Sequence, residues 1–222
     1  MSKPQVFAAL ALAAALAPPL VSAQTIVGRA AEGEKAAASC IGCHGIVGYQ
    51  SSFPEVHRVP KISGQNAKYI VASLAAYKKG DRRHPTMRAI AGSMSEQQMA
   101  DLAAYYEQHG RDSIKTVAET PARQPSAEVA ALLTKGACIS CHGANFNKPI
   151  DPSYPKIGGQ FDEYLFVALK SYKVEGNTNV GRAHPVMSAQ VKNFSNAELK
   201  AMSKYIGSLP SELRTIPQPK FR

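Results

Sequence analysis

Four cysteines and the histidines that follow them are the residues of this chain whose types and spacing indicate chemistry. The 222 residues contain only four Cys. They form two C-x-x-C-H motifs, made of Cys40, Cys43 and His44, and of Cys138, Cys141 and His142. Two thiols three positions apart can form thioether bonds to both vinyl groups of a porphyrin, and the next histidine can then bind the iron. The motifs therefore predict two covalently attached haem c groups.

Two other kinds of site use C-x-x-C pairs, and both fit the chain less well. In a zinc ribbon the two pairs are roughly 15–20 residues apart, whereas Cys40 and Cys138 are separated by 98 positions. A thioredoxin-like dithiol belongs to a βαβ pattern, which the sequence lacks. Neither site requires a histidine after each second cysteine, so haem attachment is the prediction.

A low-spin haem iron that carries electrons needs a sixth ligand, and each half of the chain supplies candidates in an H-P-x-M segment. The segments end at Met87 and at Met187. A thioether ligand favours ferrous iron and so raises the reduction potential. We predict Met87 and Met187 as the sixth ligands, in loops that precede a helix. The rival ligands are His84 and His184, which would give a lower potential.

The motifs belong to an internal repeat that preserves the order of several elements. A P-K-I-S-G-Q element begins at Pro60, and P-K-I-G-G-Q begins at Pro155. In each half this proline carbonyl is predicted to accept a hydrogen bond from the motif histidine, which would fix the imidazole ring. His57 and His109 have no counterpart in the repeat, and we expect both to be exposed.

The repeat divides the chain into two tandem domains. We predict a first domain over residues 24–110, a linker over 111–126 and a second domain over 127–222. The linker contains Pro121 and Pro125 and lacks periodic apolar residues. The two domains are therefore expected to pack as separate copies of one plan.

Both domains are predicted to be helical. Residues 66–79 carry apolar side chains at helical spacing. Ser95 with Gln98, and Ser195 with Glu198, form the S-x-x-Q/E pattern of a capping box. No alternating apolar pattern is long enough for a strand, so the predicted class is all-α with long loops.

The first 23 residues are predicted to be a secretory signal peptide. Lys3 precedes an apolar stretch over residues 6–17, and the V-S-A sequence that ends at Ala23 matches a cleavage site. An uncleaved anchor is the alternative, but the stretch is shorter than the ~20 residues of a spanning helix. We therefore expect an exported protein that is cleaved after Ala23.

The formal net charge is +10, which raises the question of a nucleic-acid partner. The dense basic runs are short, at residues 78–79 and 82–83, and stacking aromatic residues are not interleaved with them. Export also separates the protein from nucleic acid. We therefore expect no nucleic-acid partner and a basic surface that attracts an acidic protein.

The C-x-x-C-H motifs, the P-K-I-x-G-Q elements, the Met segments and the Ser-capped helices together resemble the cytochrome c4 family. The resemblance covers about residues 30–209. It implies two tandem class I cytochrome c domains related by a pseudo-twofold axis, in the periplasm of a Gram-negative bacterium. By position, it implies haem attachment at Cys40, Cys43, Cys138 and Cys141, and iron ligation by His44, Met87, His142 and Met187.

These inferences predict an electron carrier rather than an enzyme. The predicted role is a shuttle between a quinol–cytochrome c reductase and a terminal oxidase, with redox proteins as partners. The alternative is a dihaem subunit of a dehydrogenase complex, such as a flavoprotein that oxidises sulfide. A two-haem peroxidase would need an open position on one iron, which two equivalent Met segments disfavour. Peripheral attachment to a membrane is left open.

Overall fold

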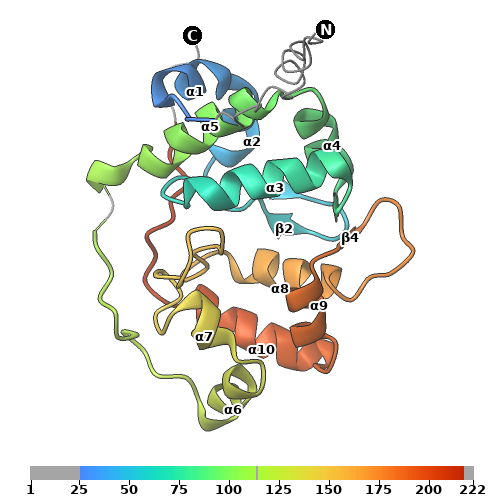
Figure 1. The fold of residues 1–222 in the computed structure, drawn as a ribbon. Coiled ribbons are helices and arrows are strands. Elements are labelled where there is room, and N and C mark those ends of the chain that lie inside the picture. The colour runs from blue at the N-terminus through green and yellow to red at the C-terminus, as the bar shows by residue number, and fades with distance from the viewer. Residues whose placement is uncertain (1–25, 114, 218–222) are drawn as a thin grey trace, which may run out of the picture.

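The computed structural model describes residues 26–113 and 115–217, so the predicted signal peptide lies outside the described residues. The helices form two lobes, with α1–α5 above α6–α10 in Figure 1, and the connecting segment runs down one side. Among the helices of these residues, none is both long and apolar enough to cross a membrane. The predicted all-α class is confirmed, with short strand pairs that the sequence pattern did not indicate.

Helices dominate each lobe. The elements of the first lobe are α1 (Ala30–Ala36), α2 (Ala38–His44), β1 (Gln50–Ser51), β2 (His57–Arg58), α3 (Ala67–Lys79), β3 (Arg82–Arg83), α4 (Pro85–Gly92), α5 (Glu96–Gln108) and the 3-10 turn η1 (Arg111–Ser113). The elements of the second lobe are α6 (Ala127–Lys135), α7 (Cys138–His142), α8 (Asp162–Ser171), β4 (Gly181–Arg182), α9 (Pro185–Val191) and α10 (Asn196–Gly207).

Local sequence signals explain where the longer helices begin and end. Ser95 and Gln98 exchange side-chain and backbone hydrogen bonds at the start of α5, and Ser195 and Glu198 do the same at α10. Both predicted capping boxes are therefore confirmed. Helix α3 ends at Gly80, whose φ of 91° lies in the left-handed region that glycine adopts without strain.

Each lobe buries its own hydrophobic core. In the first lobe α5 packs against α1 and α3, and Met99 and Leu102 are buried between them. In the second lobe α10 packs against α8 and α6 around Leu199 and Phe146. Two separate cores fit the predicted arrangement of two tandem domains. The exact domain boundaries at residues 110 and 127 remain a prediction.

The P-K-I-x-G-Q elements join the two lobes through reciprocal hydrogen bonds. The side chain of Gln65 donates to the Lys156 carbonyl and accepts from its N–H, both at 2.9 Å. Gln160 makes the same pair with Lys61, at 2.9 and 3.0 Å. Because each lobe offers the same residue to the other, the contact has the form that a pseudo-twofold axis requires.

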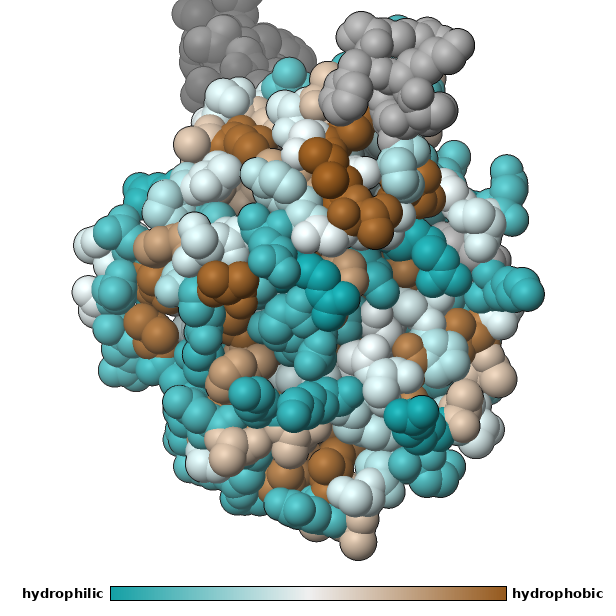
Figure 2. Space-filling model, turned by 180° about the vertical axis from the view of Figure 1, so that it is seen from behind, coloured by the Kyte–Doolittle hydropathy of each residue, from teal (hydrophilic) through white to brown (hydrophobic). Residues whose placement is uncertain are grey.

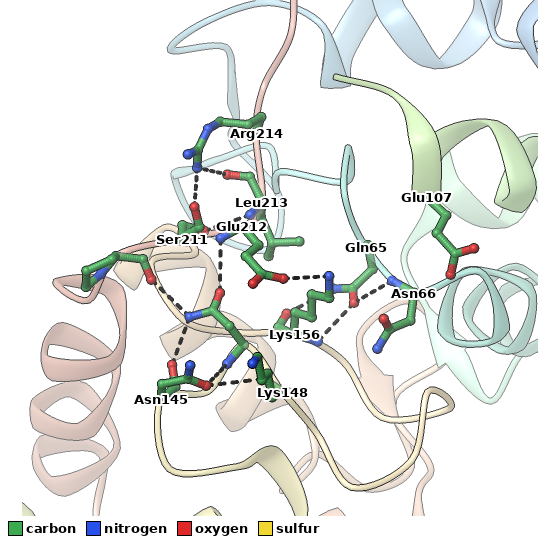
Figure 3. Close-up of polar contacts among 12 residues, drawn as sticks. Gln65, Asn66, Glu107, Asn145, Lys148, Lys156, Ser211, Glu212, Leu213 and Arg214 are labelled. Carbon is green, nitrogen blue, oxygen red and sulfur yellow. Dashed lines mark hydrogen bonds and ion pairs between the residues drawn. The ribbon is translucent and has the colours of Figure 1, made fainter. Parts of the chain in front are cut away.

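The C-terminal segment of the second lobe continues onto the first lobe (Figure 1). The Arg214 N–H donates to the Ser63 carbonyl at 3.0 Å. Figure 3 shows Lys156 between Gln65 and Glu212, and its ammonium lies 2.9 Å from the Glu212 carboxylate. These contacts hold the junction between the lobes at a fixed geometry.

Two short antiparallel strand pairs complete the fold. β1 and β2 form a hairpin in the first lobe, with Ser51 opposite His57. β3 and β4 come from different lobes, with Arg82 opposite Arg182. The second pair places residues 100 positions apart in the sequence side by side at the junction.

Candidate haem sites

The first lobe contains a cavity of about 420 Å³. The four residues predicted for the first haem all line it: Cys40, Cys43, His44 and Met87. The cysteines and the histidine come from α2, and the methionine comes from α4. The structure thus brings residues 43 positions apart to the wall of one cavity.

The second lobe contains a corresponding cavity of about 260 Å³. It is lined by the four residues predicted for the second haem: Cys138, Cys141, His142 and Met187. Here α7 supplies the motif and α9 supplies the methionine. Both cavities therefore combine two thiols, an imidazole and a thioether, which is the donor set that a haem c group with His and Met ligands requires.

A backbone carbonyl orients each motif histidine. His44 Nδ1 donates to the Pro60 carbonyl at 2.8 Å, and His142 Nδ1 donates to the Pro155 carbonyl at 3.2 Å. Burial lowers the pKa of both imidazoles, which favours the neutral form that binds metal. The bonds to Pro60 and Pro155 agree with the prediction from the repeat, and they leave Nε2 as the nitrogen available to iron.

None of the four motif cysteines is paired in a disulfide. Burial raises the pKa of Cys40 and of Cys138, so both sulfurs stay protonated at neutral pH. A thioether forms when an S–H group adds across a vinyl double bond. The place of the sulfurs on the cavity walls fits that attachment.

The H-P-x-M segments begin helices, which corrects the expectation that they are loops. His84 is the N-cap of α4, and its Nδ1 accepts the Met87 N–H at 3.5 Å. His184 caps α9 in the same way, with 3.3 Å to the Met187 N–H. The proline after each histidine occupies the first helical turn, where its fixed φ suits the helix and no N–H is needed.

The expectation that His57 is exposed is wrong. Its side chain is only 5 % exposed, and its Nδ1 donates to the Glu55 carbonyl at 2.8 Å. The ring centroid lies 6.1 Å from that of Tyr164 in the second lobe. The β1–β2 hairpin carries the histidine into the junction, and no repeat signal marks this hairpin. His109 is partly buried and bonds to Ser63 at 2.9 Å.

Sequence reasoning missed two sets of residues on the cavity walls. Arg82 and Arg182 precede the capping histidines by two positions, so the repeat offset of 100 marks them, but their types do not suggest haem binding. Tyr106 lines the first cavity with a buried hydroxyl that has no hydrogen-bond partner among the described residues. No pattern in the sequence distinguishes Tyr106 from a core tyrosine of α5.

Comparisons with known proteins agree with this geometry. The profile of the cytochrome c family matches residues 30–109 and 126–210, which is more than half of the chain. Cytochrome c4 of Pseudomonas aeruginosa is 30% identical over 186 residues, covering 82% of this chain and 89% of that protein. A thiosulfate dehydrogenase electron acceptor of Stutzerimonas stutzeri is 25% identical and covers 82% and 88%.

A solved structure extends the likeness to three dimensions. The crystal structure of reduced recombinant cytochrome c4 from Pseudomonas stutzeri aligns with a TM-score of 0.56 and 25% identity, covering 82% of this chain and 100% of that one. Family, fold and donor sets thus agree over both halves of the sequence. The chain belongs to the cytochrome c family and, within it, to the cytochrome c4 proteins, electron carriers with two covalently bound haem c groups.

Proposed function

We propose that the protein is a periplasmic shuttle that takes electrons from a quinol–cytochrome c reductase and delivers them to a terminal oxidase. The observation that carries this proposal is the matched pair of cavities, each lined by two thiols, an oriented imidazole and a thioether. Membership of the cytochrome c4 proteins supports the export that the predicted signal peptide, cleaved after Ala23, would bring about. Each bound haem stores one electron as its iron alternates between the ferric and ferrous states.

The proposed ligand sets follow the two cavities. We assign thioether attachment to the four cysteines and iron ligation to His44 with Met87 and to His142 with Met187. Burial supports methionine over histidine as the sixth ligand in the second lobe, because Met187 packs against the hydrophobic core whereas His184 is exposed. If His44 with Met87 and His142 with Met187 bind the two irons, neither haem would have a position left for a substrate, which suits a carrier.

The surface suits transient contact with a charged partner. The formal net charge is +10, and hydrophobic residues form small, separate patches among hydrophilic ones on the face shown in Figure 2. Long-range attraction speeds the encounter with an acidic protein and weakens as salt is added. A carrier that must bind and leave quickly benefits from this kind of attraction more than from a large apolar interface.

Rapid mixing of the ferrous protein with a purified terminal oxidase tests the proposal. We expect both haems to be oxidised in one encounter-limited phase, at a rate that falls steeply between low and physiological ionic strength. Oxidation no faster than the reaction with dissolved oxygen alone would contradict the proposed role as a shuttle to the oxidase.

A second candidate role is that of electron acceptor for a dehydrogenase that oxidises a sulfur compound. It is favoured by the likeness to proteins named thiosulfate dehydrogenase electron acceptors, at 25% and 27% identity. Rapid mixing of the ferric protein with thiosulfate dehydrogenase and thiosulfate distinguishes the two roles. Reduction within the turnover time of the dehydrogenase, together with slow oxidation by the oxidase, would favour the dehydrogenase partner.

A further inference from the structure

Two arginines of the same charge lie opposite each other at the junction of the lobes. Arg82 in β3 and Arg182 in β4 are directly paired across the antiparallel strands. Arg82 is only 8 % exposed, and Arg182 is partly buried. Like charges placed directly opposite on paired strands repel each other. The arrangement therefore needs a compensating contact.

The contacts that the protein supplies are aromatic and uncharged. A terminal nitrogen of Arg82 donates to the Tyr69 hydroxyl at 2.7 Å, and Arg182 donates to the Tyr164 hydroxyl at 3.1 Å. The same guanidinium groups lie 5.3 to 5.6 Å from the ring centroids of Tyr69, Tyr77, Tyr164 and Tyr172. Within residues 26–113 and 115–217, neither arginine forms an ion pair with a carboxylate.

Burying two guanidinium groups side by side is unfavourable in free energy unless an anion binds to them. A guanidinium stays protonated in proteins because its pKa is far above neutral. Buried charges are normally paired, since removing an isolated charge from water costs several kcal/mol. Each guanidinium has five N–H donors in a planar fork that matches a carboxylate. The tyrosine contacts use only part of that capacity.

The position of the cluster indicates which anion completes it. Arg82, Tyr69 and Tyr164 line both cavities, whereas Arg182 lines only the second. A haem group carries two propionate groups, which are carboxylates, on the edge of its ring. A haem bound in each cavity would therefore bring carboxylates, the anionic partners that the two arginines lack.

We propose that Arg82 and Arg182, framed by the four tyrosines, form a shared carboxylate-binding site for the propionate groups of both haems, and that Arg82 couples the two haems because it faces both cavities. The inference rests on the two haem groups and not on the identity of the redox partners. A positive charge beside a haem stabilises the ferrous state over the ferric state, because the ferric iron carries one more positive charge. Arg82 therefore raises both reduction potentials, and Arg182 raises mainly that of the second haem.

Replacing the charges one at a time tests the proposal in the haem-loaded protein. The variants are Arg82→Gln, Arg182→Gln and, as a matched control, Arg83→Gln. Arg83 is on the same strand as Arg82 but donates to the Asn177 and Val174 carbonyls and lines neither cavity. Redox titration followed by NMR of the haem methyl groups reports the potential of each haem separately.

We expect Arg82→Gln to lower the ferrous-to-ferric ratio of both haems about tenfold at a fixed potential, a shift of about 59 mV for a one-electron couple. Arg182→Gln should lower chiefly the second potential, and Arg83→Gln should change neither by a comparable amount. Unchanged potentials in a folded Arg82→Gln protein, or a shift in only one haem, would overturn the shared site.

A second measurement decides the matter if Arg82→Gln does not fold. Arg82→Lys keeps the positive charge but loses the planar fork, so both potentials should stay near those of the unaltered protein. The propionate bending mode in the resonance Raman spectrum should nevertheless shift, because its hydrogen bonds change. A propionate mode identical in the two proteins would contradict contact between Arg82 and the propionates.

Discussion

The first cavity carries Tyr106 where the second carries Ile206, although both positions lie on the same face of the capped helices α5 and α10. The first cavity is also bordered by the β1–β2 hairpin, whereas the second lobe has an irregular segment around the buried Phe146 at the corresponding place. Other contacts are the same in both lobes. They are the carbonyl bond to the motif histidine, the histidine cap and the arginine–tyrosine pair.

This contrast separates the contacts that are common to both sites from the features that occur in only one lobe. Contacts that occur twice orient the motif histidines and the helices that carry the proposed methionine ligands, so a change there should damage either site equally. Features that occur once alter the polarity of one cavity wall or the stability of one lobe. Since polarity, burial and nearby charge set the potential of a haem, the unmatched features provide the means for two identical cofactors to differ.

Removal of a single methionine gives the largest expected difference between the sites. Met87→Ala should abolish about half of the near-infrared charge-transfer band that Met-bound ferric haem shows, because only the first iron loses its thioether. Met187→Ala should remove the other half, and the double variant should show none. As a control, Met99→Leu changes a buried methionine of α5 and should leave the band intact. A full band in Met87→Ala would contradict the proposed ligand.

The packing of the first helix gives the next largest difference. An added Cβ at Gly33 would lie 2.0 Å from the Asp101 carbonyl oxygen, so α1 crosses α5 at a distance that only glycine permits. The matching residue of α6, Ala131, is exposed. Gly33→Ala should lower the free energy of unfolding of the first lobe by about 1–3 kcal/mol, with the second lobe unchanged. Scanning calorimetry resolves the two transitions.

Gly92→Ala is the matched control for this prediction. Gly92 is the last residue of α4, and an added Cβ would meet nothing within 4 Å. The substitution should raise stability slightly, by roughly 0.5–1 kcal/mol, because alanine loses less backbone entropy in a helix. If the two substitutions changed the free energy of unfolding equally, the close approach of α1 to α5 at Gly33 would not be the cause of the effect.

The features that sequence reasoning predicted are those with a local signal. Motif spacing located the four cysteines and two histidines, the serine three positions before Gln98 or Glu198 located two helix starts, and the repeated proline located the histidine carbonyl bonds. Each depends on residues close together in the chain or on an exact repeat. That is why these parts of both sites followed from sequence before any contact was visible.

The missed features depend on contacts between distant residues or on weak local preferences. The pairing of Arg82 with Arg182 joins strands of two residues each, too short for an alternating pattern. Histidine is not among the preferred N-cap residues, so residues 84–87 were predicted to be a loop although they begin α4. His57 is buried because a hairpin of one lobe lies beside a tyrosine of the other. Only tertiary packing determines these positions.

Acid should lower the stability of the first lobe by breaking the ion pair between Arg29 and Asp101, which we call the clamp and which has no counterpart at the matching positions of the second lobe. The Arg29 guanidinium, 2.8 Å from Asp101, lowers the pKa of that carboxyl to about 2, and Ala201 occupies the matching place in α10. An unfolded aspartate has a pKa of about 3.9, so the unfolded chain takes up this proton first. The clamp therefore stabilises the folded lobe above about pH 4 and loses its effect as pH falls towards 2.

Asp101→Asn should flatten the loss of stability of the first lobe in this acid range and leave the second lobe unaltered. Asp112→Asn, at an exposed residue of η1, is the control and should leave the slope as it is. Denaturant unfolding at a series of pH values measures both slopes. An unaltered slope in Asp101→Asn would assign the acid sensitivity to other carboxyl groups.

The smallest predicted effect concerns the hydroxyl of Tyr106, which distinguishes the first cavity wall from the second. The side chain is 4 % exposed, and its oxygen has no hydrogen-bond partner among the described residues. A buried hydroxyl without a partner costs about 1–3 kcal/mol, so Tyr106→Phe should leave stability unchanged or raise it by up to about 1 kcal/mol. The potential of the first haem should shift while that of the second stays constant, because only the first cavity loses a polar group. A loss of stability above ~1 kcal/mol would mean that the hydroxyl is hydrogen-bonded in the haem-loaded protein, and the contrast with Ile206 would then lie in bonding rather than in polarity alone.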